Sequence, residues 1–258
     1  KAVSSFWEKI KQMRWYSFIG MQKRVAQDFS HIITVSKRSG RDISAEFKIP
    51  LNRFIIIPNG IDTTLFYPMP EIKPENNRII VTNSAETPLK GLFYLLKAIK
   101  EISKTREIKL VVVGVPKKNG GILKLINTLG IGNLITFTGR IDHQEFVAQY
   151  ARAAIAVVPS VYEGFGLPAG EAMACAIPVI STTGGALPEV VGDAGILVPP
   201  SDDKALVKAI TALCDNPAWA YNLGQAGYKR VQKLFTWKRA AEKTVSAYRE
   251  AISDYHQF

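Results

Sequence analysis

After residue 77, short runs rich in Val and Ile alternate with longer stretches of helical periodicity, and this alternation limits the available folds more than any other feature. Most of the apolar runs lack polar alternation, as expected when helices cover both faces of a parallel sheet. Strands and helices that alternate in this way predict an α/β fold with a doubly wound, Rossmann-like parallel sheet. We expect strands at Ile79–Thr82, Ile108–Val113, Leu134–Thr138, Ile155–Pro159, Pro178–Ser181 and Ile196–Val198. We expect helices at about Leu89–Ser103, Gly121–Leu129, Gln144–Ala153, Leu167–Ala174 and Asp203–Cys214.

A second, smaller unit precedes this sheet. Two strands at His31–Val35 and Phe54–Ile57 are expected to flank a helix at about Ser36–Phe47. One β-α-β unit cannot bury its own faces, so it is interpreted as the remnant of another sheet whose other strands are absent from the sequence. Residue 1 is Lys and no signal peptide follows it, which suggests a piece of a longer chain.

Three prolines in YPMPEIKPENN interrupt both helical and strand periodicity, so a linker is expected there. The sequence thus divides into residues 1–66, the linker 67–77, residues 78–235, and a C-terminal helix in 236–258 that is expected to cross back to the first part.

The charge is basic and uneven. The 258 residues carry 33 Lys and Arg against 22 Asp and Glu, and eleven of these cations but only four of the acids lie in residues 1–60. The aromatic and basic segment Phe6–Phe29 is interpreted either as packing against an absent part of its own domain or as a peripheral surface for anionic lipid. Nucleic acid is not expected as a partner, because no recognition helix or aromatic and basic sheet accompanies the charge.

No apolar run approaches the ~20 residues of a membrane-spanning helix. The two cysteines, Cys175 and Cys214, lie outside any disulfide or zinc pattern, so a cytoplasmic location is expected, including the inner face of the membrane. Cys175 is expected to be a packed, inert helix residue.

The three histidines lack the spacing of a metal site or triad, and no metal is expected.

Ligands of open parallel sheets bind outside the carboxyl ends of the strands. Three loops follow such ends, and the one at Ser160–Glu171 (SVYEGFGLPAGE) is the most informative. Its glycines permit close approach of the backbone to a ligand, and the first turn of the helix that follows favours an anion such as phosphate. Glu163 and Glu171 are placed so that both carboxylates could point into one cleft, where they suit the paired hydroxyls of a sugar or ribose. The other two loops are Asn83–Gly91 and Gly114–Gly121.

The string PSVYEGFGLPAGEAMACAIPVISTTGGALPEVVGDAGILVPP, from Pro159 to Pro200, resembles the donor-nucleotide half of the retaining family-4 glycosyltransferases, which have the GT-B fold of two Rossmann-like domains. The two glutamates match the E-x7-E motif of that family. Upstream, HIITVSKRSGRD and IIIPNGIDTTLFYP resemble the family's passage from the first domain to the second. The resemblance covers roughly residues 25 to 250 and implies that residues 1–66 are the last part of the acceptor-side domain.

The resemblance also implies roles for individual residues. Glu171 is similar to the residue that holds the donor ribose, and Glu163 to the one near the transferred sugar and its reacting centre. Lys90 corresponds to the lysine that neutralises the donor pyrophosphate, and Arg140 to the stretch that lines the nucleobase. Without the resemblance, Lys90 would be interpreted as a solvated surface lysine, and for Arg140 a position in solvent after its strand stays open as the alternative. The backbone amides expected to hold sugar hydroxyls or phosphate oxygens are those of Phe165, Gly166 and Leu167.

One departure from the family is clear. The arginine of its G-R-x-x-x-x-K-G pattern is missing, because Ser84 and Ala85 stand in the corresponding positions. Loss of a charge-assisted contact of roughly 1.5–3 kcal/mol would weaken donor binding about tenfold or more. Neutral hydrogen bonds from Asn83, Ser84 or Thr87 are the expected compensation.

The predicted function is a retaining hexosyltransferase that moves a sugar from a nucleoside diphosphate sugar to an acceptor sugar or lipid-linked acceptor, with no cofactor and no metal. The resemblance places the acceptor site and a further catalytic histidine in the first domain, so the fragment is expected to be inactive alone. Two alternatives stay open. One is a module that binds a sugar nucleotide without transferring it, and the other is a sugar-nucleotide epimerase of the same fold.

Overall fold

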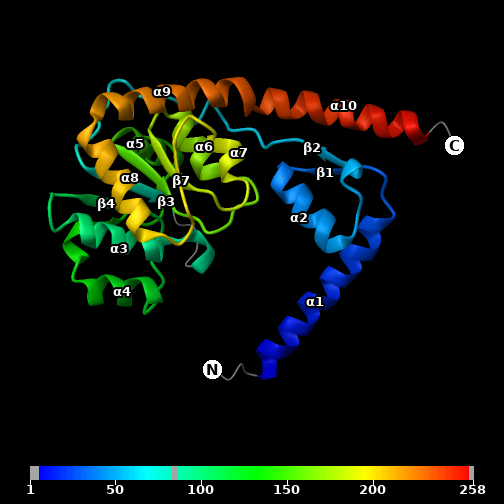
Figure 1. The fold of residues 1–258 in the computed structure, drawn as a ribbon, viewed down its shortest axis with the longest axis horizontal. Coiled ribbons are helices and arrows are strands. Elements are labelled where there is room, and N and C mark those ends of the chain that lie inside the picture. Colours follow the sequence, from blue (N-terminus) through cyan, green and yellow to red (C-terminus); the bar gives the residue numbers. More distant parts are fainter. Residues whose placement is uncertain (1–5, 83–86, 256–258) are drawn as a thin grey trace.

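The computed structural model describes residues 6–82 and 87–255, with side chains from residue 17 onward. Its main element is a parallel six-stranded sheet in the order β5-β4-β3-β6-β7-β8 (Figure 1), the order of doubly wound dinucleotide-binding folds. The predicted fold class is therefore confirmed, and no end of an expected strand is wrong by more than one residue. The strands are β3 (Arg78–Thr82), β4 (Lys109–Val113), β5 (Ile135–Phe137), β6 (Ile155–Val158), β7 (Val179–Thr182) and β8 (Ile196–Val198).

Helices cover both faces of this sheet, because successive side chains of each strand point to opposite sides. Ile79 and Val81 of β3 pack into a core with α3, α4 and α8, whereas Ile80 packs into a second core with α5, α6, α7 and α9. We call the sheet with these seven helices the large lobe. The helices are α3 (Leu92–Ile102), α4 (Gly121–Leu129), α5 (His143–Ala151), α6 (Leu167–Ala174), α7 (Leu187–Val191), α8 (Asp203–Asp215) and α9 (Pro217–Leu234).

The first expected helix of the large lobe begins later than predicted. Residues Pro88–Lys90 form a 3-10 turn, and α3 starts only at Leu92. Gly91 between them has a φ of +69°, which is outside the helical region and interrupts the helix. The short helix α7 was not expected, because five residues are too few to show a helical period.

The remaining elements form what we call the small lobe. Strands β1 (Ile32–Thr34) and β2 (Phe54–Ile56) pair in parallel, and helix α2 (Lys37–Phe47) connects them, as predicted. Helix α1 (Phe6–Gln27) contacts α2, and Lys23 and Gln27 donate to the last carbonyls of that helix. The long helix α10 (Trp237–Tyr255) continues the line of α9 from the large lobe over β1 and β2 (Figure 1).

The two lobes are joined by two chain segments that run side by side. The backbone amide of Ile61 donates to the carbonyl of Phe235 at 2.6 Å, and Ile61 forms a parallel bridge with Thr236. A Cβ added to Gly60 would come within 2.6 Å of Trp237, so this close approach requires glycine. The two connecting segments are therefore in direct backbone contact where they pass between the lobes.

Among the described residues, we find no helix that combines the length and the apolar character needed to cross a membrane.

Candidate functional site

A cavity of about 430 Å³ lies at the carboxyl ends of β3 and β6, at the switch in strand order where the sheet topology predicts a ligand site. The residues that line it come from the ends of the two strands, the 3-10 turn before α3, the helix α5, the loop after β6, the start of α6, and one position in the crossing between the lobes. They are Asn59, Thr82, Lys90, Phe146, Val158, Pro159, Ser160, Glu163, Phe165, Gly166, Leu167, Pro168 and Glu171.

An ion pair between Lys90 and Glu163 lies in this cavity. The Nζ atom of Lys90 donates to Oε1 of Glu163 at 2.8 Å, and the Ser160 hydroxyl donates to the same oxygen at 2.8 Å. The exposed fractions of the Lys90 and Glu163 side chains are 31% and 14%, so solvent screens the pair less than it screens a surface pair. The second carboxylate oxygen of Glu163 accepts no hydrogen bond from the residues that the structure describes, so it is free to meet a ligand.

Close backbone contacts hold the loops that carry this pair. A Cβ added to Gly91 would lie 1.9 Å from the carbonyl oxygen of Pro159, so the turn carrying Lys90 can press against the end of β6 only because residue 91 is glycine. The amide of Val161 donates to the Leu89 carbonyl at 2.7 Å, which fixes the same turn. These contacts place the Lys90 side chain over the Glu163 loop.

Glu171 lies one turn into α6 and is largely buried. Burial raises the pKa of its carboxyl to about 7, and a hydrogen bond with Tyr150 opposes part of that rise. Tyr150 is itself fully buried, and burial followed by the Glu171 charge raises its pKa well above the usual 10. At neutral pH Glu171 is therefore present in both protonation states, so it can accept or donate hydrogen bonds to hydroxyl groups.

Unpaired backbone amides complete the site. Gly166 has a φ of +107° and stands directly before α6. In the described part of the chain, the amides of Phe165, Gly166 and Leu167 have no acceptor; those of Gly166 and Leu167 stand at the amino end of the helix, where free amides are usual. Together with Lys90, they give the cavity donors suited to an anion.

The small lobe also contacts the site loop. Ser36 caps the amino end of α2, and its hydroxyl donates to the Gly164 carbonyl at 2.8 Å. The Ser39 hydroxyl donates to the same carbonyl at 3.0 Å. Tyr162 donates its phenol hydrogen to Asp42 of α2 at 2.6 Å. The loop that carries Glu163 is thus held by both lobes.

The structure brings six of the eight candidate residues together in this cavity: Lys90, Glu163, Phe165, Gly166, Leu167 and Glu171. Arg140 does not line it; the residue is exposed just beyond the edge strand β5. Ser84 lies outside the described residues, as do Asn83 and Ala85. The Gly114–Gly121 loop does not line the cavity either.

The sequence alone did not identify Ser160 or Tyr150 as residues of the site. The only available signal for Ser160 was its place directly after a buried strand. Tyr150 gave no signal, because its partner Glu171 lies on another helix.

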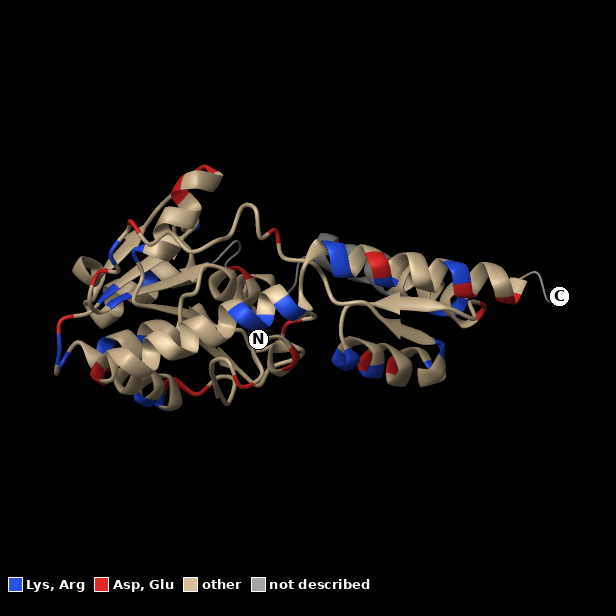
Figure 2. Cartoon of the chain, turned by 90° about the horizontal axis from the view of Figure 1, so that it is seen from above, with Lys and Arg blue, Asp and Glu red and all other residues tan. Residues whose placement is uncertain are grey.

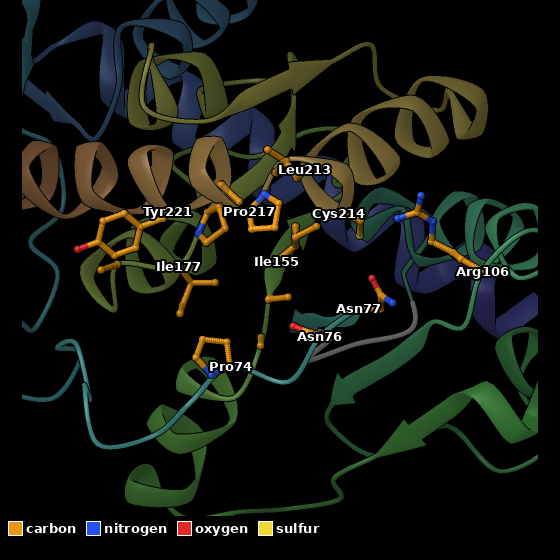
Figure 3. A pocket seen from close by; sticks show the side chains of 15 residues that line it. Pro74, Asn76, Asn77, Arg106, Ile155, Ile177, Leu213, Cys214, Pro217 and Tyr221 are labelled. Atoms are coloured by element: carbon orange, nitrogen blue, oxygen red, sulfur yellow. The ribbon is translucent and has the colours of Figure 1, made fainter.

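A second cavity, of about 510 Å³, opens at the amino ends of β3, β6 and β7 (Figure 3). Its walls are mostly apolar, and Arg106 stands at one end beside Cys214 while Tyr221 stands at the other. It shares no lining residue with the Lys90 cavity. Over the described ranges, no cluster of His, Cys, Asp and Glu side chains has the composition of a metal site.

Comparison with known proteins bears on this arrangement. Residues 67–230 match the family model for glycosyl transferases group 1. The MMP alpha-(1->4)-mannosyltransferase of Mycolicibacterium hassiacum is 39% identical over 255 residues, which cover 98% of this chain and 62% of that protein. This chain spans about three fifths of the length of the first curated relatives it matches.

Solved structures share the fold. Sucrose-phosphate synthase from Thermosynechococcus elongatus aligns with a TM-score of 0.80 and 32% identity, covering 90% of this chain and 61% of that one. HepE from Anabaena, solved in complex with UDP-glucose, aligns with a TM-score of 0.77 at 19% identity over 90% of this chain and 68% of that one, a likeness of fold alone. The family match extends over more than half of the chain and includes Lys90, Glu163 and Glu171, so this chain belongs to the group 1 glycosyl transferases.

Proposed function

We propose that this chain is the donor-binding part of a retaining glycosyltransferase of family 4, which transfers a hexose from a nucleoside diphosphate sugar to an acceptor hydroxyl. The single observation that carries the proposal is the convergence of Lys90, Glu163, Glu171 and the unpaired backbone amides of residues 165–167 on one cavity at the switch in strand order. A cation and helix amides suit a diphosphate, and two carboxylates suit sugar and ribose hydroxyls.

In the proposed reaction, the bond between the anomeric carbon and the phosphate oxygen breaks, and the acceptor oxygen attacks from the same face. The departing phosphate oxygen takes the acceptor proton, so no covalent enzyme intermediate is required. Lys90 and the unpaired amides of residues 165–167 stabilise the charge that develops on the diphosphate. Glu163 lies near the positive sugar, and Glu171 holds the ribose hydroxyls. Arg140 is proposed to contact the nucleobase when donor is bound.

We also propose that the two lobes belong to different domains. Residues 1–66 would end the acceptor-side domain, 67–77 would link the domains, 78–235 would bind the donor, and 236–258 would return to the first domain. Ala240 and Ala247 of α10 pack against Ile55 of β2 and against Ile57 just after it, which supports this return. The acceptor would then bind mainly to residues that precede this chain in the whole protein.

The identity of the sugar is proposed from relatives. The protein from Mycolicibacterium hassiacum is named as a mannosyltransferase, and so is an Escherichia coli protein, O-antigen chain mannosyltransferase B, that is 36% identical over 115 residues. GDP-mannose is therefore the first donor to test, and UDP-glucose, the ligand in the HepE structure, is the second. Metal independence, a lipid-linked acceptor and a site at the inner membrane face are parts of the same proposal, the last supported by the basic residues 1–60.

The first experiment measures the melting temperature of the chain with UDP, GDP and ADP, because a ligand that binds only the folded form must stabilise it. One of these diphosphates is expected to raise the melting temperature, and the rise is expected to persist in EDTA. Absence of a shift with all three would contradict the donor site.

The second experiment uses the whole protein that contains this chain. The expected result is release of nucleoside diphosphate, stimulated by acceptor, and a product whose anomeric configuration by NMR equals that of the donor. Tight donor binding without turnover would instead support a binding module, which the missing family arginine at Ser84 and Ala85 favours. A changed sugar in the product would support an epimerase.

A further inference from the structure

A hollow of about 520 Å³ lies between the lobes. The loops after β1 and β2 line one side of it, and the ends of α7, α9 and α10 line the other. Its charged residues are Lys37, Glu189, Arg230, Arg239 and Lys243, and we call it the basic hollow. Phe165 stands between the basic hollow and the Lys90 cavity and lines both of them. The basic hollow therefore holds four cations and one carboxylate at the carboxyl ends of parallel strands, where such sheets take ligands.

The one carboxylate already has partners. Oε2 of Glu189 accepts from the backbone amide of Lys37 at 2.9 Å, and Oε1 accepts from that of Arg38 at 2.7 Å. Glu189 thus occupies the amino end of α2, and none of the four cations donates to its carboxylate. Glu189 therefore forms no ion pair with the cationic side chains, which can still bind an anionic ligand.

Arg230 is held rigidly at the wall of the basic hollow. Its Nε donates to the Val190 carbonyl at 2.8 Å, and its Nη2 donates to the Glu189 carbonyl at 2.9 Å. A Cβ on Gly192 would come within 2.6 Å of its guanidinium carbon, and the guanidinium lies 5.9 Å from the centre of the Phe235 ring. The nearest carboxylate is Asp193 at 3.8 Å from Nη1, and its side chain is 98% exposed. Arg230 is therefore a fixed cation whose charge is only weakly offset.

Arg239 and Lys243 are one turn apart on α10, so they lie on the same face and repel each other. Within the ranges that the structure describes, neither side chain has a hydrogen bond or an ion pair, and the same is true of the Lys37 ammonium. Figure 2 shows bands of Lys and Arg along α10, the helix that ends at C. Glu242 and Glu250 line a neighbouring hollow with Lys243 rather than this one. An anion between these cations would remove their repulsion.

We propose that the basic hollow binds a phosphate group, either free phosphate or the phosphate of a small phosphorylated molecule. The bound anion would bridge the lobes, because Lys37, Arg239 and Lys243 belong to the small lobe whereas Arg230 belongs to the large lobe. Binding there would favour the arrangement in which the lobes are close together. The proposal needs no sugar transfer, so it stands or fails separately from the proposed function.

The test is titration calorimetry of the intact chain with inorganic phosphate and with glycerol 3-phosphate, with glycerol as the uncharged control. We expect saturable binding of the phosphates that weakens as the salt concentration rises, and no binding of glycerol. A higher affinity for the ester than for the free ion would assign the hollow to a phosphorylated molecule. Equal affinities would assign it to free phosphate. Either result supports the site, whereas the absence of saturable binding would overturn it.

Variants locate the bound anion. The double change Arg239→Gln and Lys243→Gln removes two side chains without known contacts, so it should leave folding intact and lower the affinity at least about tenfold. The matched control is Lys229→Gln with Lys238→Gln, which removes the same charge from exposed neighbours on α9 and α10 that do not line the hollow.

The control pair is expected to change the affinity by less than about twofold, because these exposed charges do not line the hollow and are screened by solvent and salt. Equal losses in the two double variants would show attraction by net charge alone and overturn the proposal. Loss of binding in Lys90→Gln, with no loss in Arg239→Gln/Lys243→Gln, would place the anion in the Lys90 cavity and also overturn it.

Discussion

The ammonium of Lys90 and the carboxylate of Glu163 are 73 residues apart in sequence, yet they meet at 2.8 Å where β3 and β6 end. Since a donor diphosphate would need the same ammonium, the pair has two states in the proposed function. Without donor, Lys90 neutralises Glu163; with donor, Lys90 turns to phosphate and Glu163 faces the sugar. The two residues should therefore respond differently to substitution.

Lys90→Gln is expected to weaken binding of the nucleoside diphosphate about 10- to 100-fold, because a charge-assisted contact of about 1.5–3 kcal/mol is lost. Calorimetric titration with the diphosphate that stabilises the chain measures this. Lys124→Gln, an exposed lysine on α4 that does not line the cavity, is the matched control and should leave the affinity unchanged. Equal affinities in the wild type and Lys90→Gln would contradict the assigned role.

Glu163→Gln is expected to lower the turnover of the whole protein at least about 100-fold, since the carboxylate would stabilise charge only in the transition state. The donor affinity should change little, because the substitution also frees Lys90 from its ion pair. Steady-state kinetics and donor titration on the same preparation separate the two effects. A variant that lost donor affinity but kept its turnover would show that Glu163 serves binding instead.

Glu171 should make the stability of the chain depend on pH. Burial raises the pKa of its carboxyl from 4.5 to about 7, so the folded state holds this proton more tightly than the unfolded state does. The contribution to the unfolding free energy is therefore fully present below about pH 4.5 and is lost as the pH rises through about 7, a difference of at most about 3 kcal/mol.

Urea unfolding of wild type and Glu171→Gln between about pH 4 and 8 measures this difference. The wild type should lose stability relative to the variant across that interval. Effects of other carboxyl groups cancel in the comparison, including Asp42 and Asp62, whose lowered pKa values act at more acidic pH. Parallel curves for the two proteins would exclude a raised pKa at Glu171.

Gly91→Ala is expected to destabilise the chain by at least about 2 kcal/mol, because the residue has a positive φ and the new methyl group would meet the Pro159 carbonyl. The displaced turn should also reduce donor affinity through Lys90. Gly121→Ala is the control, since a Cβ there meets nothing within 4 Å and the residue begins α4. Chemical denaturation should show a change within about 1 kcal/mol for this control. Similar stabilities for the two variants would show that the Gly91 turn can relax.

Much of the large lobe could be predicted from the sequence because its strands are buried on both faces. A run such as Ile79–Thr82 has no polar alternation, and this is itself the mark of a covered parallel strand. The loop between β6 and α6 could be predicted as a place for an anion, since its glycines precede the amino end of a helix. The roles given to Glu163 and Glu171 came from the family resemblance and stay predictions.

Contacts between distant segments could not be predicted. The hydroxyl of Ser36 reaches the carbonyl of Gly164 across 128 residues of sequence, and no local pattern marks either atom. The late start of α3 was missed because a single glycine decides it through its close approach to Pro159, which follows the distant strand β6. Arg140 follows a strand as expected, but that strand is at the edge of the sheet, and the order of strands is not written in their local sequence.

The paired crossing at Ile61 and Phe235 has a mechanical consequence. Two polypeptide segments bonded side by side can bend together, but twisting one lobe against the other would stretch the hydrogen bond between them. The two lobes should therefore open and close by a hinge motion about one axis rather than sample many relative orientations. A flexible insertion in either segment would release the torsional restraint while leaving the interior of each lobe intact.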